Sequence, residues 1–190
     1  MFRILLLSLF ILLPAWAQAG ETPLPNPQVI IKTTQGDIGL RLFRDKSPIT
    51  VENFLNYVDS GHYNGTIFHR VIPGFMIQGG GFLPDMTKKE TGEPIVNESK
   101  NKLHNVRGTI VMARTNDPNS ATNQFFINQR TNLRLDWTPG QPGYTVFGEV
   151  TSGMDVVDYI VSSPVRKVGG FENVPAQPII ITEIKRKSLL

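Results

Sequence analysis

Residues 68–80 read FHRVIPGFMIQGG, and this stretch decides how the chain is expected to fold. Two short apolar runs flank the dipeptide Pro73-Gly74, which is typical of a tight turn. The pattern predicts two strands joined by that turn. Because successive strand residues point to opposite faces, His69 and Arg70 are expected on opposite sides of the first strand. An apolar floor with Arg70 and Gln78 at its rim would suit a ligand that has one apolar part and one amide group.

The spacing of apolar residues changes to that of a helix at residues 48–60, where they recur at positions i, i+3, i+4 and i+7. Ser47 is expected to cap the first turn of this helix, and Gly61 is expected to end it. A second, shorter helix is predicted at residues 153–161, capped by a hydroxyl group of residue 151 or 152.

Further short apolar segments are predicted strands, at residues 29–34, 37–43, 108–113, 124–128, 144–150 and 178–185. The first two are expected to form a hairpin with a two-residue turn at Gln35-Gly36. Many short strands together with two helices indicate a mainly β protein built on an antiparallel barrel.

The composition bounds the size and class of the protein. With 190 residues, 40% of them hydrophobic, the chain can form one domain with a substantial core. Residues 20–26 contain two prolines and no periodicity, so we interpret them as a linker that precedes a single domain at residues 27–190. The formal net charge of +3 is too small and too scattered to indicate a nucleic-acid partner.

Common catalytic and metal-binding patterns are absent from the sequence. There is no cysteine, which excludes thiol catalysis and most zinc sites and suits an oxidising compartment. The three histidines, His62, His69 and His104, do not have the spacing of a metal site. No serine-nucleophile motif or phosphate-binding loop is present. We therefore expect no metal and no cofactor, and we interpret His69 as a structural residue.

The first 19 residues have the pattern of a secretory signal peptide. Arg3 supplies a positive charge, residues 4–14 form an apolar run, and small residues follow. The run is about 11 residues long and a membrane-spanning helix needs about 20, so no stable membrane anchor is expected. Cleavage after Ala17 or Ala19 would release a protein exported to the periplasm or secreted beyond it.

Two blocks of sequence, residues 68–80 and residues 108–128, resemble in order and separation the active-site motifs of the cyclophilins, a family of peptidyl-prolyl cis-trans isomerases. The resemblance extends from Pro27 to the C-terminus and suggests a bacterial exported member. It implies a closed eight-stranded antiparallel β-barrel with a helix at each open end. It also implies a monomeric, cofactor-free enzyme that acts on proline-containing unfolded or partly folded polypeptides.

Rotation about an X-Pro peptide bond needs neither a nucleophile nor a metal. The planar amide is held by a barrier of about 18–20 kcal/mol, and twisting it returns a lone pair to the proline nitrogen. A fixed cation that donates a hydrogen bond to this nitrogen stabilises the twisted state more than either planar state. Arg70 is the predicted cation, because its guanidinium group is rigid and always charged.

The resemblance assigns the other site residues by their positions in this sequence. Arg70, Gln78 and Phe75 are expected to be catalytic. The expected substrate-binding residues are Met76, Phe126 and Leu135 in the pocket for the proline ring, Gln124 beside Arg70, Ala113 and Arg114 along the edge that binds the peptide backbone, and Tyr144.

Three positions depart from the common pattern of the family. A tryptophan of eukaryotic members falls on Arg134, just before Leu135. Tyr144 stands where the family often has histidine, and Arg114 where it often has asparagine. Because the tryptophan is associated with binding of the drug cyclosporin, we expect weak cyclosporin binding. None of these changes affects Arg70, so activity is expected; the alternative is a noncatalytic module, or chaperone, that binds proline peptides in the same groove.

Overall fold

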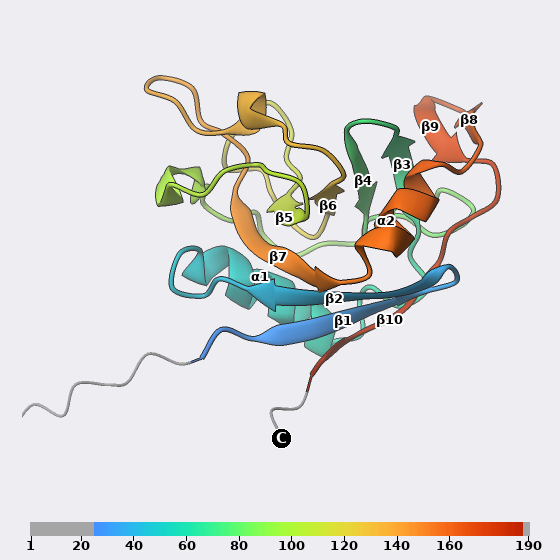
Figure 1. Ribbon diagram of the computed structural model, residues 1–190, viewed down its shortest axis with the longest axis horizontal. Helices are drawn as coiled ribbons and strands as arrows, with labels where there is room; N and C mark the ends of the chain where they lie inside the picture. Colours follow the sequence, from blue (N-terminus) through green and yellow to red (C-terminus); the bar gives the residue numbers. More distant parts are fainter. Residues whose placement is uncertain (1–24, 188–190) are drawn as a thin grey trace, which may run out of the picture.

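The computed structural model describes residues 25–187. The predicted signal peptide, residues 1–19, and most of the predicted linker lie outside the described residues. Eight strands form one antiparallel sheet with the spatial order β10-β1-β2-β7-β5-β6-β4-β3 (Figure 1). The bounds of these strands are β1 Gln28–Thr33, β2 Gly36–Leu42, β3 Phe68–Ile72, β4 Met76–Gly79, β5 Thr109–Met112, β6 Phe125–Asn128, β7 Val146–Ser152 and β10 Ile181–Arg186.

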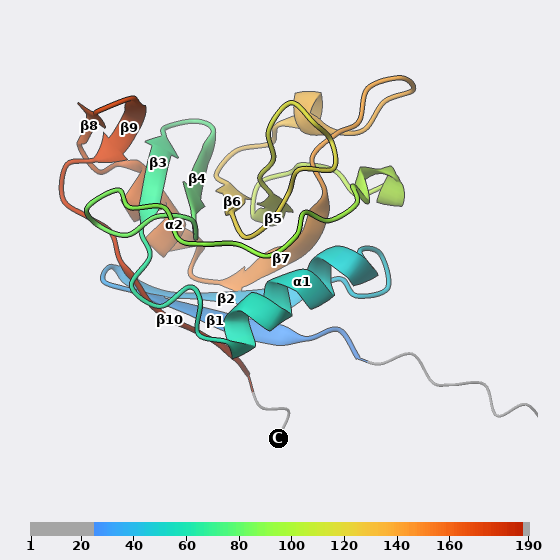
Figure 2. The ribbon, with the colours of Figure 1, turned by 180° about the vertical axis from the view of Figure 1, so that it is seen from behind.

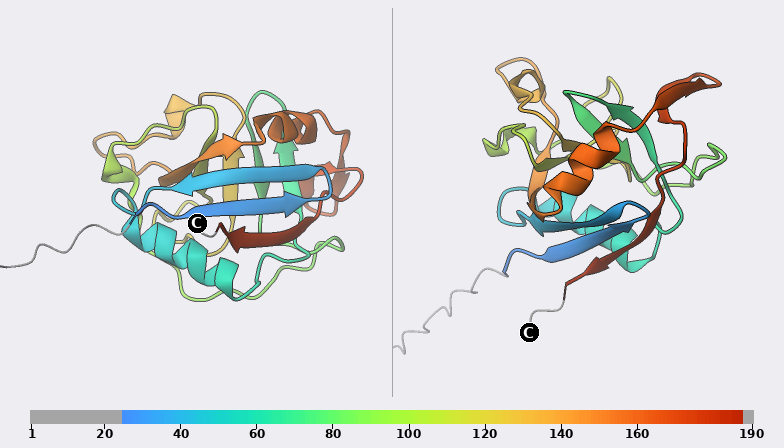
Figure 3. Two further views of the ribbon diagram at one scale, coloured as in Figure 1. Left: turned by 60° about the horizontal axis from the view of Figure 1, so that its bottom comes forward. Right: turned by 45° about the vertical axis from the view of Figure 1, so that its right-hand side comes forward.

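Two α-helices accompany the sheet, α1 (Pro48–Asp59) and α2 (Met154–Val161). They lie on opposite sides of strands β1 and β2 (Figure 3). The predicted mainly β fold with two helices is therefore confirmed. None of the helices in the described part of the chain has the length and apolar composition needed to cross a membrane.

The curved sheet is open, so the predicted closed barrel is corrected to an eight-stranded half-barrel. Its edge strands, β3 and β10, form no ladder with each other. The chain segments that precede them meet in one isolated bridge between Ile67 and Ile180. Beside β3 the hairpin strand β9 (Phe171–Pro175) packs instead, without joining the sheet (Figure 2). Around this bridge the amide of Phe68 donates to the carbonyl oxygen of Ile179 at 3.0 Å and the amide of Ile181 donates to that of Thr66 at 2.7 Å, so the two edges are joined over a few residues and not by a ladder.

The main core lies between α1, α2 and the inner face of the sheet. Helix α1 buries the complete stripe that its sequence period predicts, namely Val51, Phe54, Leu55 and Val58. Burial of each such side chain contributes about 1.5–3 kcal/mol, which is enough to hold the helix on the sheet. Phe54 packs against the rings of Tyr63, Phe125 and Phe147 at centroid distances of 5.3, 5.6 and 5.2 Å.

The first turn of α1 is capped from a distant loop, which corrects the expected role of Ser47. The Ser47 hydroxyl donates to the carbonyl oxygen of Val146 at 2.9 Å and makes no capping hydrogen bond. The carboxylate of Glu98 accepts hydrogen bonds from the amides of Ile49 and Thr50 at 3.2 and 2.8 Å. A carboxylate at this end of a helix also interacts favourably with the helix dipole.

Two other local predictions shift by a residue or two. Thr33 pairs with Gly36 across the first hairpin, so its turn residues are 34 and 35 rather than Gln35-Gly36. Gly153, in a left-handed conformation with φ of 83°, precedes α2 in place of the expected hydroxyl cap. Both differences arise because a glycine accepts positive φ at a position where the chain must turn sharply.

The hairpin of β8 (Val165–Val168) and β9 is the element that the sequence pattern did not reveal. Most of its residues are at least partly exposed, so no apolar alternation marks it.

Candidate active site

The predicted site is built on a row of residues that crosses four strands. Arg70 on β3 lies opposite Gln78 on β4, Gln78 lies opposite Phe126 on β6, and Phe126 lies opposite Val111 on β5. Residues directly opposite each other in adjacent strands present their side chains on the same face of a sheet. The row therefore places a cation, an amide and an apolar wall side by side.

This face carries its own apolar cluster, separate from the main core. Its buried members are Met76, Val111, Phe126 and Val146. Met76 and Phe126 are only 1% and 5% exposed, so they form a fixed floor. Alternation along β4 sends Ile77 to the main core and Gln78 to this second face, as the sequence predicts.

A pocket opens above this floor, with Met76 and Phe126 among its lining residues. Nine of the ten predicted site residues line it, namely Arg70, Phe75, Met76, Gln78, Ala113, Arg114, Phe126, Leu135 and Tyr144. The tenth, Gln124, lines an adjoining hollow and accepts a hydrogen bond from Gln78 Nε2 at 3.0 Å.

Arg70 supplies an uncompensated positive charge at the rim of the pocket. Its Nη1 donates to Gln78 Oε1 over a long distance of 3.4 Å. Among the described residues it forms no ion pair with a carboxylate. The amide of Gln78, itself held by Gln124, thus orients the guanidinium group without neutralising it.

His69 lies on the opposite side of β3 from Arg70, as the strand alternation predicts. Its ring packs on Phe82 with a centroid distance of 4.6 Å. Burial, with a smaller contribution from the charge of Arg70, lowers the pKa of His69 to about 4. The imidazole is therefore neutral near pH 7, and no histidine or carboxylate of the described part of the chain lines the pocket. The described lining of the pocket thus offers neither an imidazole nor a carboxylate for acid–base catalysis.

Phe75 is positioned by a buried network of amide side chains beneath the pocket. Its carbonyl oxygen accepts hydrogen bonds from the backbone amide of Gln129 at 3.0 Å and from Asn132 Nδ2 at 3.1 Å. Asn132 Nδ2 also donates to Asn128 Oδ1 at 2.7 Å, and Asn128 Nδ2 donates to Asn105 Oδ1 at 3.2 Å. Sequence reasoning did not find this network, because Asn105 and Asn132 lie in loops, where asparagine is an ordinary turn residue, and Asn128 is a single polar residue at the end of β6.

Arg114 is held at another wall of the pocket. Its guanidinium group donates to the carbonyl oxygens of Gly143, Thr115 and Pro142 at 3.2, 2.8 and 2.7 Å. Its Cζ atom also lies 4.3 Å from the ring centroid of Tyr144. These contacts fix the side chain over Tyr144 and leave its charge without a carboxylate partner among the described residues.

The hollow next to the pocket was also missed by the sequence analysis. Besides the residues it shares with the pocket and Gln124, it is lined by Lys88, Thr115, Ser120 and Thr122. These residues come from turn-rich loops, where neither period nor motif marks a binding surface. No cluster of three or more histidines, aspartates or glutamates suited to a metal ion occurs within residues 25–187.

A family model described as "Cyclophilin type peptidyl-prolyl cis-trans isomerase/CLD" matches residues 28–186. The chain belongs to this family. The cyclophilin is 50% identical over 179 residues to "Peptidyl-prolyl cis-trans isomerase A" of Dickeya dadantii, a match that covers 94% of this chain and 92% of that protein. It is 51% identical over 166 residues to a peptidyl-prolyl cis-trans isomerase of Acinetobacter baylyi, covering 87% and 88% of the two chains.

A solved structure gives the same result. The cyclophilin is 32% identical to a cyclophilin-type isomerase of Cryptosporidium parvum crystallised in the presence of the dipeptide Ala-Pro. The two structures superpose with a TM-score of 0.74 over 85% of this chain and 99% of that one. With the family match and the two bacterial relatives, the activity is established: the cyclophilin is a peptidyl-prolyl cis-trans isomerase.

Proposed function

We propose that the pocket binds the proline ring of an X-Pro segment and that Arg70 is the catalytic cation. The observation that carries the proposal is the position of Arg70, which lies beside a buried apolar floor and forms no ion pair with a carboxylate within residues 25–187. The absence of any histidine or carboxylate from the pocket lining excludes proton transfer by a side chain of these types and leaves electrostatic stabilisation.

The proposed mechanism follows from the electronic structure of the amide. As the X-Pro bond twists, resonance is lost and the proline nitrogen gains a lone pair that can accept a hydrogen bond. The guanidinium group of Arg70 donates to this lone pair, which neither planar isomer offers. A hydrogen bond to a charged group contributes about 1.5–3 kcal/mol, and each 1.36 kcal/mol lowers the barrier enough for a tenfold rate increase. Other contacts must supply the rest of the acceleration.

The remaining site residues would supply those contacts. Phe75, Met76, Phe126 and Leu135 hold the proline ring, while Gln78 and Gln124 orient the cation. Ala113 and Arg114 provide the edge along which the peptide backbone lies, and Tyr144 closes the wall beside Phe126, with their ring centroids 5.8 Å apart. A ring held in this way leaves the preceding carbonyl group free to rotate.

We further propose that the substrates are proline-containing segments of unfolded or partly folded proteins exported to the periplasm. The predicted signal peptide supports the location, and the Ala-Pro dipeptide named with the related structure supports proline recognition. In this proposal the protein acts as a monomer, without a cofactor and without a membrane anchor. Fractionation of cells that produce the full chain would test the location, and recovery from the cytoplasm alone would contradict it.

The role of Arg70 is tested by the cis-to-trans rate of a short X-Pro peptide at about 10 °C, where the uncatalysed step takes minutes. The proteins compared are residues 20–190, the Arg70→Ala variant, and Arg166→Ala as a matched loss of charge on exposed strand β8. We expect a large loss of kcat/KM in Arg70→Ala alone. Equal rates in all three proteins would refute the role of Arg70. If none exceeded the uncatalysed rate, a peptide-binding module would remain.

A further inference from the structure

Within the described part of the chain, the pocket and two of the hollows beside it are lined by positive charge and no negative charge, whereas another hollow that Arg70 also lines contains Glu172. Among the described residues, neither aspartate nor glutamate lines the pocket, the hollow beside Gln124, or a further hollow beside Phe75 that is lined by Arg130 and Arg134. The cations that line these three spaces are Arg70, Arg114, Lys88, Arg130 and Arg134. We call these five residues the cationic rim.

Arginines elsewhere on the described surface are mostly neutralised. Four of them form ion pairs with carboxylates, in the pairs Arg41–Glu149, Arg44–Glu52, Arg107–Asp158 and Arg186–Asp59. No member of the cationic rim appears in any ion pair of the described residues. Among the described arginines, those without a carboxylate partner therefore lie mostly around the active site.

Two members of the rim are held in place by aromatic rings that line the pocket. Arg134 Cζ lies 4.9 Å from the ring centroid of Phe75, and Arg114 Cζ lies 4.3 Å from that of Tyr144. A guanidinium group over an aromatic face is attracted by the ring and keeps its charge. The charges are thus fixed near the pocket, unlike those of freely moving surface lysines.

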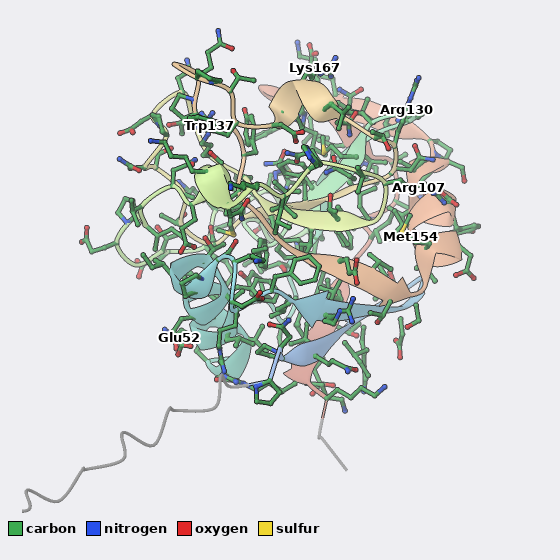
Figure 4. The ribbon with its side chains drawn as sticks, turned by 60° about the vertical axis from the view of Figure 1, so that its left-hand side comes forward. Glu52, Arg107, Arg130, Trp137, Met154 and Lys167 are labelled. Atoms are coloured by element: carbon green, nitrogen blue, oxygen red, sulfur yellow. The ribbon has the colours of Figure 1, made fainter. Side chains whose placement is uncertain are left out.

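The hollow beside Phe75 is the place where two rim charges converge. Arg130 and Arg134 line it together with Gly74, which precedes Phe75 in the chain. Arg130 lies at the outer surface, in the upper part of the molecule and away from Glu52 on α1 (Figure 4). A carboxylate on a bound peptide could reach this hollow from the proline pocket, because Arg134 of the hollow packs on the ring of Phe75, which lines the pocket.

We propose that the cationic rim selects proline segments that carry aspartate or glutamate close to the X-Pro bond, with the carboxylate bound by Arg130 and Arg134. The inference rests on the proposed binding of the proline ring in the adjacent pocket. Like charges held close together repel, and a ligand of opposite charge relieves that repulsion as it binds. Lysine-flanked prolines are disfavoured for the same reason.

The test compares peptides that differ only in one residue, glutamate, glutamine or lysine, placed one or two positions before or after the X-Pro bond. We expect kcat/KM for the best glutamate peptide to exceed that of its glutamine twin about three- to tenfold at about 20 mM salt, since exposed charge pairs are individually weak. At about 500 mM salt the ratio should approach one, because ions screen exposed charges.

Two variants distinguish the effect of the cationic rim on selectivity from the effect of the net charge of the protein. Arg134→Gln should reduce the glutamate-to-glutamine ratio at least twofold, whereas Arg166→Gln, a loss of equal charge outside the three spaces, should leave it unchanged. A ratio of one at every position in low salt would overturn the proposal, as would equal effects of the two variants. The two proposals are tested by different quantities. Turnover of the glutamine peptide tests the proposed catalysis in the pocket, and the glutamate-to-glutamine ratio tests the proposed selectivity of the cationic rim.

If no peptide is turned over, dissociation constants from fluorescence anisotropy of the same labelled peptides give the ratio directly. Tighter binding of the glutamate peptide, reversed by Arg134→Gln, would then support the rim even though the catalytic proposal had failed. Equal affinities of the glutamate and glutamine peptides would refute the rim.

Discussion

Arg70 and Gln78 lie directly opposite each other on β3 and β4, and the arginine Nη1 donates to the glutamine Oε1 at 3.4 Å. The same glutamine donates through Nε2 to Gln124 Oε1 at 3.0 Å. The chain of contacts fixes which way the Gln78 amide points, with its oxygen toward the cation. An arginine oriented by a neutral amide retains its full charge for a ligand, which an arginine paired with a carboxylate does not.

Replacement of Gln78 by leucine should lower kcat/KM about tenfold. The variant keeps the size of the side chain but removes the acceptor that orients Arg70, a loss comparable to one hydrogen bond to a charged group. The measurement is the isomerisation rate of a proline peptide at low temperature. Gln141→Leu, in an exposed loop, is the control and should retain the wild-type rate. An unchanged rate in Gln78→Leu would show that Arg70 orients itself.

Asn132 is expected to act as a positioning residue for Phe75. Asn132→Ala removes the hydrogen bonds from Nδ2 to the carbonyl of Phe75 and to Asn128 Oδ1, and it leaves a buried acceptor unsatisfied. We expect a loss of stability of about 1–3 kcal/mol. At a temperature where the variant remains folded, KM should rise severalfold more than kcat changes, because the wall of the proline pocket moves.

A control variant distinguishes a general loss of stability from a loss of the positioning of Phe75. Asn26→Ala removes an acceptor for the amide of Arg44 near the start of the described chain, far along the sequence from the pocket. This control should lose some stability and keep its KM. If Asn132→Ala also kept its KM while folded, the network would be structural only.

Much of the site could be predicted because strand alternation is a strong local rule. The sequence places His69 and Arg70 on opposite faces and Met76 and Gln78 on the same face, and the structure confirms both. The resemblance to the cyclophilin motifs predicted that Phe126 and Leu135 lie in the same pocket as Arg70, although they are far from it in the sequence. The structure places them there. Strand alternation therefore predicted which face each side chain occupies, and the family resemblance predicted which distant residues share the pocket.

The parts that could not be predicted depend on contacts between distant loops. The capping of α1 by Glu98 and the support of Phe75 by Asn132 join residues that no periodicity connects. The open edge of the sheet is of the same kind, because the bridge between Ile67 and Ile180 joins segments that are far apart in the chain. Such contacts follow only from the assembled fold.

Glu98 should contribute measurably to stability through the end of α1. Its carboxylate accepts from the amide and the hydroxyl of Thr50 at 2.8 and 2.6 Å and from the amide of Ile49. Glu98→Ala should lower the free energy of unfolding by about 1–2 kcal/mol, the usual contribution of a helix cap. Glu93→Ala, an exposed acid in the same segment, should change it by less than about 0.5 kcal/mol. Equal effects in urea unfolding would refute the capping role.

Cyclosporin binding is predicted to be weak, because Arg134 occupies the position of the family's tryptophan. Arg134→Trp would replace a solvated cation beside Phe75 with a large apolar surface. We expect the dissociation constant to fall about tenfold or more, which corresponds to about 1.4 kcal/mol. Calorimetry of both proteins and of an Arg130→Trp control would measure it. Tight binding by the wild-type protein, or equal gains in both variants, would contradict the prediction.

His69 makes stability depend on pH in a defined window. The pKa of His69 is about 4 in the folded protein and about 6.5 in the unfolded chain. Between these two pH values the unfolded chain therefore binds the proton more readily than the folded protein. Stability is therefore complete above about pH 6.5 and is lost progressively as the pH falls towards 4, by roughly 3 kcal/mol in total. In urea unfolding, His69→Gln should be less stable at pH 7 yet lose less stability between pH 7 and pH 4.5. Parallel pH profiles for the two proteins would show that the imidazole titrates normally in the fold.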